Sequence, residues 1–80
     1  MIQFKELYKS NAPMLIFYAG KYVNAITAED LVQDVFLKVW QKRTFLFLKE
    51  GIKTYLYRSV QHACLDYLKH QEVKGDYINA

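Results

Sequence analysis

The residues whose side chains are best suited to binding a ligand in this 80-residue sequence lie on one face of a helix predicted over residues 52–72. They recur at intervals of three and four, which places them on a single stripe: Tyr55, Arg58, His62, Asp66 and Lys69. Lys53 and Ser59 extend this polar, aromatic and cationic strip. Cations neutralise phosphates and aromatic rings stack on unpaired bases, so the strip suits a nucleic-acid strand. A solvated helix face has a similar composition, and the residues alone leave both interpretations open.

A second candidate surface lies on the helix predicted over residues 28–43, AEDLVQDVFLKVWQKR. The core face of this helix is marked by apolar residues at intervals of three and four: Leu31, Val32, Val35, Phe36, Val39 and Trp40. Leu37 falls off that stripe and lies near Gln33 and Asp34. An acidic, amide-rich face with one leucine favours a protein contact. The alternative is the ordinary solvated side of a core-facing helix.

The first helix is predicted over residues 2–24. Pro13 should kink or break it near Ala12, because proline lacks a backbone donor and clashes with the preceding turn. We expect Asn24 to cap its C-terminus and Thr27 to be the N-cap of the next helix.

The third helix should bury one apolar face and follow a hydrophobic loop. That face comprises Ile52, Leu56, Val60, Ala63 and Tyr67, flanked by Cys64 and Leu68. Trp40 and Leu56 are both expected to be largely buried. The alternating residues of 44–51, TFLFLKEG, would suit a strand, but a lone strand has no partner here. We therefore interpret 44–51 as a loop packed onto the core.

Composition restricts the class of protein. Eighty residues, 52% of them hydrophobic, make one small globular domain, and the net charge of +3 does not by itself indicate nucleic-acid binding. A single cysteine, Cys64, excludes an internal disulfide and favours a cytoplasmic protein. The sequence shows no signal peptide, membrane span or zinc spacing, and no acid–base pair. We expect no enzyme activity, no metal and no cofactor.

Three blocks of the sequence together resemble a known family. These blocks are FKELYKSNAPMLIFYA, AEDLVQDVFLKVWQKR and IKTYLYRSVQHACLDYLK, and the resemblance covers residues 4 to about 70. Their order and spacing resemble region 2 of bacterial RNA polymerase sigma factors, more narrowly the extracytoplasmic-function (ECF) group. The sequence departs from the common ECF pattern at Tyr55, Gln61 and His62, where tryptophan, arginine and asparagine are frequent.

The resemblance implies an all-α, compact three-helix domain and a role in transcription initiation. In the family, the helix matching 28–43 docks on the clamp helices of the polymerase beta-prime subunit. By position, Asp30, Gln33, Asp34 and Leu37 would face that coiled coil. The following loop and helix of the family capture the melted non-template strand of the minus-ten promoter element. The matching DNA-binding residues would be Phe45, Leu46, Phe47, Leu48, Lys49, Glu50, Lys53, Tyr55, Arg58, Ser59, His62 and Asp66.

The same resemblance predicts the domain organisation. Residues 1–72 would form the region 2 domain, and 73–80 would begin an interdomain linker. The helix-turn-helix domain of region 4 would then be absent from this chain. An anti-sigma factor is a further possible partner, because such regulation is common in the ECF group. The alternative to a sigma-factor domain is a generic helical protein-interaction domain that binds no nucleic acid.

Overall fold

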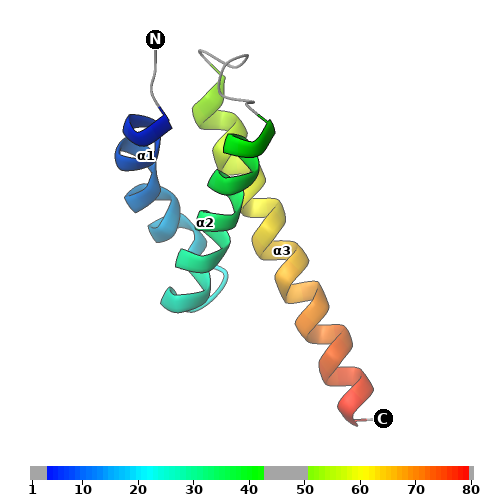
Figure 1. Cartoon of the computed structure of the whole chain (residues 1–80). Helices are drawn as coiled ribbons and strands as arrows, with labels where there is room; N and C mark the ends of the chain where they lie inside the picture. The colour runs from blue at the N-terminus through cyan, green and yellow to red at the C-terminus, as the bar shows by residue number, and fades with distance from the viewer. Residues whose placement is uncertain (1–3, 43–50, 80) are drawn as a thin grey trace.

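The computed structural model describes residues 4–42 and 51–79, the last of which, 72–79, are described by their backbone alone. Within these ranges the chain forms α1 (Phe4–Ala19), α2 (Ala25–Lys42) and α3 (Ile52–Asn79). In Figure 1, α2 runs antiparallel to both α1 and α3, and the C-terminal end of α3 projects beyond the other two helices. The predicted all-α, three-helix fold is confirmed. The predicted loop 44–51 lies outside the described residues except for Gly51.

Apolar side chains from all three helices meet in one core. The buried members are Leu7, Ala12, Leu15, Ala19, Ala28, Val32, Val35, Phe36, Val39, Ile52, Leu56, Val60 and Cys64. Phe36 is the largest fully buried side chain among the described residues, and its ring meets Tyr8 edge-on at 4.9 Å between centroids. Leu56 is fully buried, as predicted. This core fixes which sides of α2 and α3 remain exposed.

The first helix is continuous through Pro13, so the predicted break near Ala12 is wrong. Pro13 removes one backbone donor, but it lies on the exposed side of α1, where water can reach the carbonyl left without its partner. The helix also ends at Ala19, earlier than predicted, and turns over residues 20–22 lead towards α2.

Asn24, not Thr27, is the N-cap of α2. The Asn24 Oδ1 atom accepts a hydrogen bond from the Thr27 backbone N–H at 2.8 Å. The Asn24 carbonyl accepts another from the Ala28 N–H, also at 2.8 Å. The predictions of Asn24 as a C-cap and Thr27 as an N-cap are therefore both wrong. Asparagine satisfies orphan N–H groups at a helix start at least as well as threonine, so α2 begins at Ala25.

Trp40 is 43% exposed, which contradicts its predicted burial. It lies in the last turn of α2, one turn beyond Phe36, and its ring packs against Phe4 with centroids 4.9 Å apart. Phe36 and Val39 take the central positions, so the larger indole is left at the edge of the core.

The core face of α3 follows every fourth residue through Ile52, Leu56, Val60 and Cys64. This row is the i±4 ridge by which helices commonly pack. Ala63 and Tyr67, predicted as core residues, are only half-buried, and Leu68 is 39% exposed.

The buried Cys64 is a core residue, and its burial raises the pKa of the thiol. The α3 helix continues to Asn79, past its predicted end near residue 72. The assignment of 73–80 to a linker remains a prediction.

None of the described helices is both long enough and apolar enough to cross a membrane.

Candidate functional site

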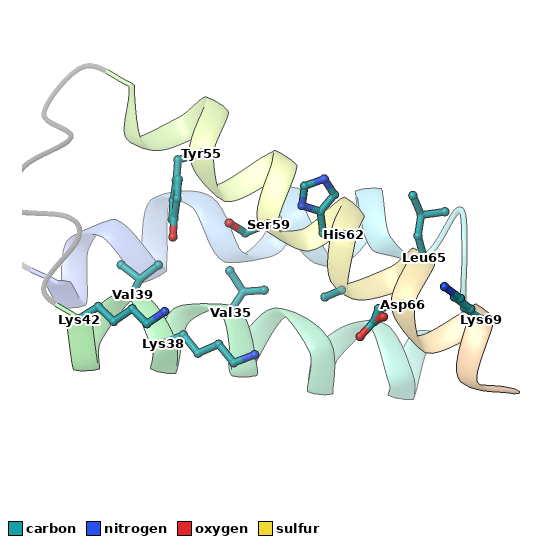
Figure 2. Close-up of a pocket in the computed structure, with 11 residues that line it drawn as sticks. Val35, Lys38, Val39, Lys42, Tyr55, Ser59, His62, Leu65, Asp66 and Lys69 are labelled. Atoms are coloured by element: carbon teal, nitrogen blue, oxygen red, sulfur yellow. The ribbon is translucent and has the colours of Figure 1, made fainter.

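A groove of about 550 Å³ runs between α2 and α3. Its floor includes the apolar side chains of Val35, Val39 and Ala63. Its walls and rim carry the polar, aromatic and larger apolar side chains: Lys38, Lys42, Tyr55, Ser59, His62, Leu65, Asp66 and Lys69. Figure 2 shows Tyr55 reaching from α3 towards α2, with Val35 and Val39 between the two helices. The groove thus combines an aromatic ring, hydrogen-bonding groups and cations.

The balance of charge in this groove is positive. Lys38, Lys42 and Lys69 contribute three cations, and Asp66 contributes one carboxylate. None of the three lysines forms an ion pair with any side chain that the structure describes. Asp66 instead lies beside His70, whose Nδ1 is 2.8 Å from the Asp66 carbonyl oxygen and 3.9 Å from its Oδ1 atom. The lysines therefore remain available for an external anion such as a phosphate.

The structure brings four of the predicted DNA-binding residues together in this groove: Tyr55, Ser59, His62 and Asp66. Lys53 and Arg58 are exposed on α3 but do not line the groove. The six predicted loop residues all fall outside the described residues: Phe45, Leu46, Phe47, Leu48, Lys49 and Glu50.

Sequence reasoning missed the contribution of α2 to this groove. Lys38 and Lys42 are one helical turn apart and follow the groove-floor residues Val35 and Val39 by three positions. That spacing was visible in the sequence. What the sequence did not show was which side of α2 faces α3, and therefore which lysines adjoin the strip on that helix.

The predicted protein-contact residues form an exposed face on α2. Asp30, Gln33, Asp34 and Leu37 are all exposed, and their spacing of three and four places them on one side of the helix. Gln33 and Leu37 also line a second groove, of about 270 Å³, between α1 and α2. The other residues that line it are Phe4, Tyr8, Phe36 and Trp40. This groove is predominantly apolar, and Asp30 and Asp34 lie on the same exposed face of α2 as Gln33 and Leu37.

A tyrosine cluster ties the end of α1 to α3. The Tyr18 and Tyr22 hydroxyls are 3.3 Å apart, and Gln61 Nε2 donates to the Tyr22 hydroxyl at 3.4 Å. The Tyr57 ring meets that of Tyr18 edge-on, at 5.1 Å between centroids. The hydrogen bond to Tyr22, followed by burial, raises the pKa of Tyr18, so its phenol stays neutral. These contacts pack the end of α1 against α3, so we assign them a role in the fold and none in the functional site.

Among the side chains described in 4–42 and 51–71, no group of three could hold a metal ion.

The chain matches a known protein family over most of its length. The model of the sigma-70 region 2 family matches residues 7–73, which include parts of all three helices. The matched range contains every residue that lines the groove between α2 and α3, and all but Phe4 of those that line the groove between α1 and α2. Comparisons with curated proteins and with solved structures gave no match. The match covers most of the chain. The chain therefore belongs to the sigma-70 region 2 family: it is a non-enzymatic sigma-factor domain of the class that binds core RNA polymerase and the minus-ten promoter element.

Proposed function

We propose that this domain opens promoters by holding the melted non-template strand of the minus-ten element in the groove between α2 and α3. The observation that carries the proposal is the convergence of Tyr55, Ser59 and His62 on one cationic groove. We further propose that Lys53, Arg58 and residues 45–50 contact the same strand, as the resemblance to the family implies.

The energetics favour a groove of this kind. Taking a base out of the duplex costs a few kcal/mol, which the protein must offset. Stacking one base on an aromatic side chain contributes about 1–3 kcal/mol. Tyr55 is 37% exposed at the groove, so its ring has both an anchored side and an accessible side. Ser59 and His62 supply the hydrogen-bonding groups that can discriminate base edges.

The polymerase would bind a different face of α2. We propose that Asp30, Gln33, Asp34 and Leu37 dock on the clamp helices of the beta-prime subunit. Exposed carboxylates beside an apolar groove suit a helical partner that presents cations together with an apolar side chain. The Gln33 amide is 3.4 Å from Glu29 Oε1, an exposed contact that a partner can replace at small cost.

We also assign the chain to the ECF group, on the three sequence blocks given above. Two of the residues that depart from the common ECF pattern, His62 and Gln61, lie in different parts of the structure. His62 lines the groove, so a histidine in place of asparagine would alter base preference. Gln61 is half-buried and donates a hydrogen bond to the Tyr22 hydroxyl, so it contributes to the packing of α3 against the end of α1. Regulation by an anti-sigma factor would follow from membership of this group.

The test of strand capture is binding of labelled single-stranded oligonucleotides by the chain assembled with core RNA polymerase. Oligonucleotides selected from a randomised pool, and their single-base variants, are titrated and followed by fluorescence anisotropy. Tyr55→Ala should weaken binding by about 5- to 150-fold, the loss expected for one stacked base. Tyr55→Phe should retain most of the affinity because it keeps the ring.

Phe17→Ala is the matched control, because Phe17 is an aromatic residue on α1 with 71% of its surface exposed and away from the groove. If Tyr55→Ala binds every oligonucleotide as tightly as Phe17→Ala does, the strand does not occupy this groove.

A further inference from the structure

The wall of the strand groove opposite Tyr55 is formed by α2, and two lysines line its rim. Lys38 and Lys42 are separated by four residues, or about 6 Å along the helix axis. This separation is close to the distance between neighbouring phosphates of an extended strand. Figure 2 shows both side chains extended along α2, below Tyr55 and Ser59 of α3.

The local chemistry keeps both lysines suited to a phosphate. Val35 and Val39, one turn apart, are buried beneath the groove, so the lysine stems lie on apolar surface while their ammonium groups reach water. Neither ammonium group has a carboxylate partner among the described side chains. Asp66 is the acidic residue in the groove, and its side chain lies beside His70.

We propose that Lys38 and Lys42 bind successive phosphates of the same single strand whose bases are held by α3. This inference rests on the proposed strand capture. It adds the orientation of the bound strand in the groove. The sugar–phosphate backbone would follow α2, and the bases would point towards Tyr55, Ser59 and His62. The helix α2 would then contact both partners, the polymerase through one side and the nucleic acid through another.

The spacing along α2 permits this division. Lys38 lies one turn after Asp34, at the border of the docking face, and about 100° around the axis from Leu37, whereas residue 42 is farther from that face. A strand on the lysine side would leave Asp30, Gln33 and Leu37 uncovered. The two partners can therefore bind the helix at the same time.

The test measures how salt affects strand binding by the polymerase-bound chain. Each phosphate contact to a single strand contributes about 0.7 to the slope of log affinity against log salt. The double variant Lys38→Ala/Lys42→Ala should lower that slope by about 1.4. Affinity should fall by the same factor for all oligonucleotides, because phosphates carry no sequence information. Lys5→Ala/Lys9→Ala, which removes two exposed lysines from α1, is the charge-matched control.

Four results separate the possible outcomes. A slope for the groove variant equal to that of the control overturns the lysine assignment, and so does a loss of polymerase binding, which would place these lysines in the docking surface. A loss that differs among single-base variants also overturns it, because the lysines would then be reading bases. Failure of Tyr55→Ala to weaken binding would instead refute the proposed strand capture itself.

Discussion

The two grooves on either side of α2 have opposite chemistry although they are built from the same helix. Towards α3, residues 35, 38, 39 and 42 line a cationic groove of about 550 Å³. Towards α1, residues 33, 36, 37 and 40 line an apolar groove of about 270 Å³. Each set follows the i, i+3, i+4, i+7 spacing of one helix face, and the two are offset by two residues, about 200° around the axis. Two interleaved patterns on one helix thus give two surfaces suited to different partners.

The largest effect on stability should come from a core substitution, because unfolding of the domain removes both grooves together. Leu56 is fully buried where α3 packs on the shared core. Leu56→Ala should lower the free energy of unfolding by about 2–5 kcal/mol through lost transfer energy and cavity formation. For a small domain that is a large share of the total stability of about 5–15 kcal/mol. Thermal melts followed by circular dichroism measure this loss, and a melt superimposable on the wild type would refute the assigned core face.

The second-largest effect should distinguish the docking face of α2 from the strand groove. Asp34 is exposed on the proposed docking face, outside both grooves. Asp34→Arg should change the free energy of unfolding by no more than about 0.5 kcal/mol, because surface substitutions seldom do more. It should nevertheless abolish retention of a beta-prime clamp-helix fragment in a pull-down, because it reverses a charge within the interface.

Glu6→Arg on α1 introduces the same charge change at another exposed site and serves as the control for Asp34→Arg. Equal retention of the fragment by the two variants would show that the acidic face of α2 is not the docking surface.

The smallest effect is spectroscopic and reports on the apolar groove alone. Trp40 is the single tryptophan of the chain and lines this groove beside Leu37. A tryptophan-free clamp-helix fragment that covers the groove should shift the Trp40 emission to shorter wavelength, because water is displaced from the indole. The same titration of Asp34→Arg should leave the emission unchanged. A shift of equal size with that variant would mean that the fragment covers Trp40 without using the acidic face.

Periodicity in the sequence was sufficient to predict the helices and most of the core. The spacing of Val32, Val35, Phe36 and Val39 identified the buried side of α2 correctly. The helix ends were less predictable, because Asn24 and Thr27 are both good N-caps and only the hydrogen bonds distinguish them. Trp40 fits the same apolar period as Phe36, but the period does not reveal that the core ends before it.

The candidate sites were predictable only in part, for a related reason. The strip on α3 could be found because its members share one helix and one period. Lys38 and Lys42 could not be joined to that strip, because the pairing of α2 with α3 depends on tertiary packing. Conversely, Arg58 shares the period of the strip but does not line the groove, because a position on the helix does not determine where a long side chain ends.

The most direct test of the two-surface account is photo-crosslinking in an assembled complex of this chain, core RNA polymerase and a promoter. A photoreactive phenylalanine analogue is placed at position 37 in one variant and at position 55 in another, both of which are exposed. If the docking face and the strand groove bind different partners, the label at 37 crosslinks to the beta-prime subunit and the label at 55 to the non-template strand. Crosslinking of both positions to the same partner, or of 55 to polymerase and 37 to DNA, would contradict this assignment.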